Sequence, residues 1–173
     1  MSHPLIDTLL ESGYVFADVD PVEVPDLEAD LRAALEEFFD PSFVAERFGL
    51  PDVYRRFVGA LERPLTAGNR HVIYYAGHLA RATRIYLDDF RWALDDRRRA
   101  GQTLPNDTLW IPVGYWSDKH DWVLCCDTTH ERFGCVLDVW DDHPWLSRHL
   151  TTYAEFPTFE AFVASEARGL GRI

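Results

Sequence analysis

The stretch Leu104–Asp142, LPNDTLWIPVGYWSDKHDWVLCCDTTHERFGCVLDVWDD, organises the predicted fold of this chain. Three apolar runs rich in aromatic and β-branched residues lie within it, at Leu109–Trp116, Trp122–Thr128 and Gly134–Trp140. Short polar segments separate these runs, and such spacing is typical of antiparallel strands joined by turns. The stretch therefore predicts a three-stranded meander in the C-terminal half of the chain.

Working outward from the meander, the sequence predicts mostly helices. The signals are polar N-caps, prolines at first helical positions, and apolar residues that recur at helical spacing. They predict a helical turn at Leu5–Leu10 and a helix over Leu27–Phe38 with Asp26 as its N-cap. Further helices are predicted after Asp40, after Leu50, over Leu79–Arg99 and after Pro157. The segments outside the helices are a short strand or extended arm near Tyr14–Val19, a loop at Pro64–Asn69, a strand at His71–Tyr75 and a loop with a helical turn at His143–Leu150. This order predicts one α+β domain over residues 1–173, mainly an antiparallel sheet with a C-terminal three-strand meander packed by helices.

Alternation along the first apolar run puts Trp110, Pro112, Gly114 and Trp116 on one face of the sheet. The second run is likewise apolar on both of its faces. Because a sheet that is apolar on both faces must bury both, we expect helices to cover it on the two sides.

The composition favours a self-sufficient core and gives no sign of export. With 47% hydrophobic residues, the chain can build a core without disulfides or metal, and it has no apolar run long enough to span a membrane. The N-terminus lacks the basic region of a signal peptide, so a cytoplasmic location is expected.

The three cysteines are predicted to be buried free thiols. A turn centred on Glu131 would place Cys135 opposite Asp127, with Cys125 only diagonal to it. Cys125 and Cys126 are adjacent on a strand and point to opposite faces. We therefore expect no disulfide and regard the thiols as small hydrophobic side chains.

Acidic residues are concentrated in the first fifty positions. The formal net charge is −12, and residues 1–50 carry twelve acids against two arginines. This balance argues against nucleic-acid binding by the N-terminal part and suits a basic partner, whose approach an acidic surface accelerates. The alternative is that the acids only keep the domain soluble.

No catalytic motif stands out, so neither a catalytic residue nor a cofactor is predicted. The histidines of the C-terminal third lie near aspartates, which leaves a small metal-dependent hydrolase as an alternative. However, His120 and His130 fall in turns at opposite ends of one predicted strand, and His143 and His149 are out of helical phase. No metal site is therefore expected.

The order and spacing of several short motifs resemble the SUKH superfamily over residues 45–167. The resemblance comprises a Gly-Leu-Pro helix start, a strand ending in Gly, a strand ending in Asp, a third strand and a closing aromatic helix. In this chain the segments are Phe48–Phe57, Ile111–Gly114, Trp122–Asp127, Gly134–Val136 with Trp140–Asp142, and Phe156–Phe162. Residues 1–40 precede this region as an acidic, helical N-terminal extension.

The resemblance implies a non-enzymatic α+β binding domain. Bacterial members of the superfamily are mostly immunity proteins that bind and neutralise a cognate toxin, often a basic nuclease. A regulatory or scaffold domain without a toxin is the other alternative. For a basic toxin partner, the candidate anchors are Trp116 and Trp140, and the candidate acids are Asp118, Asp121, Glu131, Asp141 and Asp142. Neither nucleic acid nor a membrane is an expected partner, and the sequence leaves monomer and homodimer open.

Overall fold

The structure is a computed structural model that describes residues 3–68, 70–99, 108–117, 120–140 and 152–170, with the backbone alone at 90, 92–98, 140, 152–153 and 170. The helices in these ranges are α1 (Pro4–Glu11), α2 (Leu27–Glu36), α3 (Pro41–Arg47), α4 (Asp52–Gly59), α5 (Ala76–Arg99) and α6 (Phe159–Leu170). The strands are β1 (Val15–Phe16), β2 (Leu65–Ala67), β3 (His71–Ile73), β4 (Trp110–Trp116), β5 (His120–Cys125), β6 (Val136–Trp140) and β7 (Thr152–Phe156).

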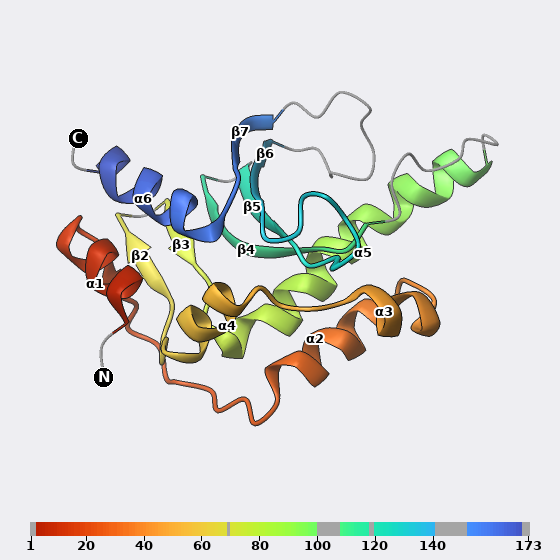
Figure 1. Ribbon diagram of the computed structural model, residues 1–173, viewed down its shortest axis with the longest axis horizontal. Helices are drawn as coiled ribbons and strands as arrows, with labels where there is room; N and C mark the ends of the chain where they lie inside the picture. Colours follow the sequence, from red (N-terminus) through yellow and green to blue (C-terminus); the bar gives the residue numbers. More distant parts are fainter. Residues whose placement is uncertain (1–2, 69, 100–107, 118–119, 141–151, 171–173) are drawn as a thin grey trace.

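All the described strands form one antiparallel sheet in the order β1-β2-β3-β4-β5-β6-β7, so every strand pairs with its neighbours in the chain (Figure 1). The α+β single-domain prediction is confirmed, and the predicted meander corresponds to β4, β5 and β6. The expected loop at Pro64–Asn69 is wrong, because Leu65–Ala67 pairs with His71–Ile73 as β2. Strand β7 was not predicted. The loop expected at His143–Leu150 lies outside the described residues.

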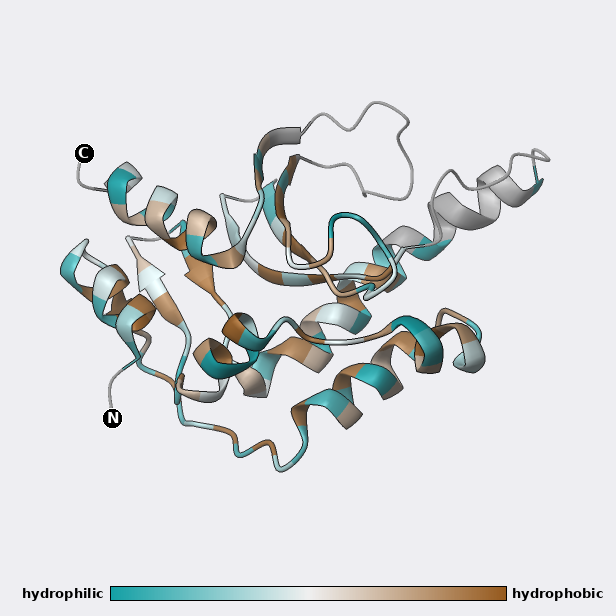
Figure 2. Ribbon diagram, in the orientation of Figure 1, coloured by the Kyte–Doolittle hydropathy of each residue, from teal (hydrophilic) through white to brown (hydrophobic). Residues whose placement is uncertain are grey.

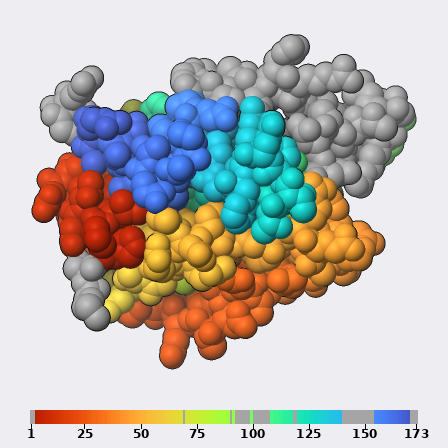
Figure 3. Space-filling view, viewed as in Figure 1, coloured from red at the N-terminus to blue at the C-terminus, as the bar shows by residue number. Residues whose placement is uncertain are grey.

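Helices cover both faces of the sheet, as predicted. Helix α5 packs against β4 on one face, and α2 packs against α5. Helix α6 lies on the other face, where the rings of Trp122 and Phe162 are 5.0 Å apart. Helix α1 lies beside α6 in both the ribbon and the space-filling views (Figures 1 and 3). The buried residues of these helices belong to one hydrophobic cluster with the sheet, and polar and apolar residues both occur along the helices (Figure 2).

The acidic N-terminal segment is built into the core. Ile6 and Leu9 of α1 and Leu31 and Leu35 of α2 are buried in the same hydrophobic cluster as the sheet. Asp26 caps α2 as predicted, since its side chain accepts a hydrogen bond from the Ala29 N–H at 3.0 Å.

The register differs from the predicted one at two places. A bulge lies between Pro112 and Gly114, so Trp110 is opposite Cys125 whereas Trp116 is opposite His120. The prediction that Trp110 and Trp116 share a face is therefore wrong, because the extra residue in β4 reverses the alternation.

The β5–β6 turn also differs, since it is centred one residue before Glu131. The Cys125 N–H donates to the Cys135 carbonyl at 2.9 Å, so these two cysteines are opposite each other. Asp127 lies outside the β5–β6 ladder and bridges to Phe48. All three cysteines are nevertheless buried free thiols, as expected. Burial raises the pKa of Cys125 to about 11 and that of Cys135 to about 12.

Within the described residues, no helix combines the length and the apolar character needed to cross a membrane.

Candidate functional site

The end of the sheet nearest the β4–β5 turn gathers aromatic and titratable residues in one row. The register places His71, Trp116, His120 and Trp140 opposite one another across β3, β4, β5 and β6. Cross-strand neighbours in register share a face of the sheet, so the side chains of His71, Trp116 and His120 lie side by side. The Trp116 and His120 rings are 4.0 Å apart, and the Trp116 and His71 rings are 6.0 Å apart.

Asp138 of β6 ties two members of this row together. Its Oδ2 accepts a hydrogen bond from the Trp116 indole N–H at 2.8 Å, and its Oδ1 lies 2.9 Å from His120 Nδ1. Both Asp138 and His120 are buried. A buried carboxylate that accepts two hydrogen bonds holds its donors in one orientation. This contact fixes the Trp116 ring and leaves only part of its side chain exposed.

Glu166 of α6 contacts the His71 end of this row. Its Oε2 accepts a hydrogen bond from the Tyr14 hydroxyl at 2.9 Å and lies 3.2 Å from His71 Nδ1. Burial raises the pKa of Glu166, and the hydrogen bonds from Tyr14 and His71 oppose that rise. Burial, followed by the charge of Glu166, raises the pKa of Tyr14 in turn. Helix α6 is thereby attached to β3 by a polar contact within a largely apolar interface.

These contacts indicate a structural network, in which each carboxylate holds two neighbours. Among the described residues, no group of three or more His, Cys, Asp or Glu side chains converges on a possible metal position. His130 lies at the far end of β5 from His120, as predicted, and its Nδ1 accepts a hydrogen bond from the Arg132 N–H at 3.1 Å. His143 and His149 lie outside the described residues.

Replacing Glu166 with glutamine is expected to flatten the dependence of stability on pH. A carboxyl whose pKa is raised in the folded state stabilises that state fully below its unfolded pKa, near the ordinary value of 4.5, and loses this contribution as pH rises through the folded value. Urea unfolding at a series of acidic pH values measures the slope. Glu160→Gln, an exposed change on the same helix, is the matched control. If Glu166→Gln and Glu160→Gln change the slope equally, the buried Glu166 carboxyl is not the source of the pH dependence.

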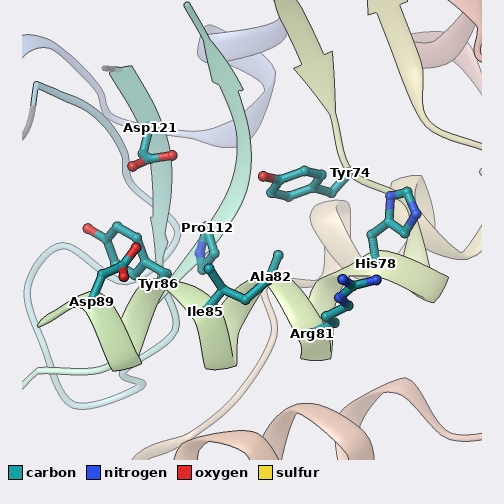
Figure 4. A pocket seen from close by; sticks show the side chains of 9 residues that line it. All are labelled: Tyr74, His78, Arg81, Ala82, Ile85, Tyr86, Asp89, Pro112 and Asp121. Atoms are coloured by element: carbon teal, nitrogen blue, oxygen red, sulfur yellow. The ribbon is translucent and has the colours of Figure 1, made fainter. Parts of the chain in front are cut away.

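A groove lies on the opposite face of the sheet, between α5 and the ends of β3, β4 and β5 (Figure 4). It encloses about 290 Å³. Ile85 and Asp89 of α5, Pro112 of β4 and Asp121 of β5 line it, together with Tyr74. Asp121 follows His120 in β5 and is opposite Tyr115, so it lies on the other face from the His120 row.

The groove is acidic at one end and basic at the other. Figure 4 shows Asp89 near Tyr86 and below Asp121, while His78 and Arg81 lie at the opposite end. Burial and then the charge of Asp121 raise the pKa of Tyr86, as they do for Tyr74, so both hydroxyls stay neutral. Burial and the nearby Arg81 lower the pKa of His78.

Carboxylates beside tyrosine rings suit a cationic side chain, because the charge is balanced and the ring faces attract it. The exposed Ile85 adds an apolar surface for the methylene groups of such a side chain. The acidic end of the groove can therefore receive an arginine or lysine from a partner.

The structure brings together only some of the residues predicted to bind a partner. Trp116 and the backbone of Trp140 are at the same end of the sheet, flanking His120. Asp121 is near that end but on the other face, in the groove. Glu131 is exposed in the β5–β6 turn, at the other end of β5 from His120. At roughly 3.3 Å per strand residue, it lies about 20 Å from Trp116 and Asp121. Asp118, Asp141 and Asp142 lie outside the described residues.

Sequence reasoning missed the parts of the network that come from other elements. Asp138 carried a signal, because a charged residue inside the apolar run Gly134–Trp140 is rarely buried without a partner. Glu166 carried none, since a glutamate on a helix is ordinarily solvated. His71 belonged to a predicted strand, but its contact with Glu166 depends on where α6 packs.

No protein-family model matches the chain, and no curated protein or solved structure was found to match it either.

Proposed function

We propose that the chain is an immunity-type binding domain that captures a basic protein toxin and blocks its activity in the cytoplasm. The observation that carries the proposal is the placement of the N-terminal acids. Of the twelve acids in residues 1–50, nine are exposed and none is buried. A surface of this kind attracts a basic protein and accelerates its association.

The groove supports the proposal by offering a place for an anchoring side chain. An arginine or lysine of the toxin would enter the acidic end, between Asp89 and the tyrosines. Toxins that act on nucleic acid need cationic side chains to bind phosphate. An inhibitor that takes up one of these side chains would compete directly with the nucleic acid.

The end of the sheet near the β4–β5 turn is the second proposed contact. Trp116 is held by Asp138 at a strand end, where a rigid aromatic side chain suits an interface. Trp140 belongs to β6, two strands away from Trp116 of β4, and its backbone is opposite His120 of β5. The proposed acids around them are Asp118, Asp141 and Asp142, which adjoin these strand ends in sequence.

Co-expression with the product of the open reading frame immediately upstream tests the proposal. We expect the pair to co-purify, and we expect the chain to restore growth of cells that the neighbouring product arrests. Growth that stays arrested, with no complex recovered, would show that this neighbour is not its toxin and would remove the main support for the assignment.

For the captured toxin, replacing Asp141 and Asp142 with lysine is expected to slow association and to reduce its dependence on salt. Stopped-flow or surface-based kinetics over a salt series gives both quantities. Glu46→Lys with Glu160→Lys changes the net charge equally at exposed positions away from this end. If both double variants behave alike, net charge accounts for the effect and the proposed site is wrong.

A further inference from the structure

Exposed apolar side chains are concentrated in one short segment, residues 15–23, which we name the acidic arm. Among the described residues, six large hydrophobic side chains are exposed, and four of them fall within the arm. They are Val15 (59%), Phe16 (45%), Val19 (39%) and Val22 (56%). In Figure 1 the arm starts below α1 and runs along the lower edge of the molecule toward α2. Such a concentration on one segment indicates an interaction surface.

Beyond β1, the arm has no regular secondary structure and is held in place by two further hydrogen bonds. The Ala17 N–H donates to the Pro64 carbonyl at 2.9 Å, and the Val22 N–H donates to the Tyr75 hydroxyl at 3.1 Å. Pro21 has no N–H and fixes its own φ angle. Because the arm is ordered before binding, it loses less conformational entropy when a partner docks than a flexible tail would lose.

The arm begins at an open edge of the sheet. Strand β1 is the first in the strand order and pairs with β2. Val15 is opposite Thr66 and the Ala17 N–H binds the Pro64 carbonyl, so the N–H and C=O of Phe16 point to the outer edge. A hollow of about 380 Å³ is lined by Phe16 of this strand with Ile6 and Leu10 of α1, and its remaining lining residues are His3, Ala60, Glu62 and Arg63. An added strand would find backbone partners and space for an apolar side chain here.

Acidic side chains alternate with the apolar ones. Asp18, Asp20 and Glu23 are exposed, and none of them has an ion pair with another described residue. A second copy of the chain would bring the same charges against them, in a protein of net charge −12. The charge pattern therefore favours a basic occupant over self-association.

We propose that the acidic arm docks a basic, extended segment of the partner protein, which adds to the edge of β1. Lysine or arginine side chains of that segment pair with Asp18, Asp20 and Glu23, and its apolar residues cover Val19 and Val22. This inference rests on the proposed function only in that both require a basic protein partner.

A fluorescein-labelled peptide of four Lys-Val repeats is the probe. We expect saturable binding by fluorescence anisotropy, weakened by salt, and none by a peptide of four Glu-Val repeats. Neutralising the arm with Asp18→Asn, Asp20→Asn and Glu23→Gln is expected to weaken binding about tenfold, as the loss of three exposed ion pairs implies. Hydrogen exchange of the Phe16 amide should slow about tenfold in the complex, because the added strand protects it.

The matched control is Glu11→Gln, Asp30→Asn and Glu46→Gln, which removes the same charge from exposed positions outside the arm. Equal weakening by both triple variants, absence of saturable binding, or unchanged exchange at Phe16 would overturn the proposal. Sedimentation that shows a dimer without peptide, together with slow exchange of the Phe16 amide in that dimer, would assign the edge to a second copy and overturn the proposal as well.

The peptide assay also separates this inference from the proposed function. If the peptide binds but the neighbouring gene product is not captured, the proposal for the arm stands and the proposed toxin-binding function is wrong. Capture of that product with unchanged affinity by the arm variant would remove the arm assignment alone.

Discussion

Trp122→Ala is expected to lower the free energy of unfolding by about 3–5 kcal/mol, the usual cost of removing a large buried aromatic side chain. Trp122 is fully buried and packs edge-on against Phe162 of α6. Gly114 on the neighbouring strand makes room for it, since a Cβ at Gly114 would lie 3.0 Å from Trp122 Cε3 and would clash with the Val72 carbonyl oxygen. The ring thus joins the middle of the sheet to its covering helix. Urea unfolding measures the loss.

The control for this change is Phe133→Ala, which removes an exposed aromatic side chain from the β5–β6 turn. We expect it to cost about 0.5 kcal/mol or less. Since total stability is commonly about 5–15 kcal/mol, Trp122→Phe provides a milder variant if the alanine form does not fold. Equal costs for Trp122→Ala and Phe133→Ala would show that the ring does not hold α6 on the sheet.

Arg47→Ala is expected to cost about 3–5 kcal/mol, because it leaves a buried carboxylate without its counter-charge. The Asp127 side chain is fully buried, and Arg47 Nη2 lies 2.6 Å from its Oδ2. Arg47 Nε also donates to Asp127 Oδ1 at 3.1 Å and to the Thr129 hydroxyl at 2.9 Å. Asp127 Oδ2 accepts no well-aligned hydrogen bond from the described residues, so its charge depends on this ionic contact. Denaturant unfolding of the purified variant measures the cost.

Two further variants separate charge from packing at this pair. Combining Arg47→Ala with Asp127→Asn should recover part of the lost stability, because the amide keeps an acceptor for the Thr129 N–H without the buried charge. Arg84→Ala breaks an exposed pair with Glu37 and should cost about 1 kcal/mol or less. A double variant no more stable than Arg47→Ala would indicate that the arginine acts through packing alone.

Much of the local structure follows from the sequence. The cap at Asp26 and the helix start at Asp40-Pro41 depend on contacts within a few residues, and both are present. The strands of the meander were predictable because each is an apolar run bounded by turn residues. The predicted strand at His71–Tyr75 is present as β3. Leu65–Ala67 was not predictable, because it is too short to display a period and becomes a strand only where β1 and β3 pair with it.

The candidate site was predictable in composition and not in arrangement. Trp116 and Asp121 were both identified as partner-binding residues, yet they lie on opposite faces of the sheet. The bulge at Val113 reverses the alternation in β4, and one extra residue is invisible in an apolar run. A turn centred one residue earlier is equally invisible between β5 and β6, and so is the contact of Asp127 with Arg47, which is eighty residues earlier.

The α+β class, the ends of several helices, the central strands and the concentration of acids near the N-terminus could all be predicted from the sequence alone. These properties depend on composition and on contacts between residues close in the chain. The packing of distant elements brings Glu166 to His71 and places Asp121 in a groove under α5. It also leaves Val15, Val19 and Val22 exposed beside acids that have no ion pair with another described residue. Each of these depends on how distant elements pack, and packing selects among registers and faces that local patterns leave equal in free energy.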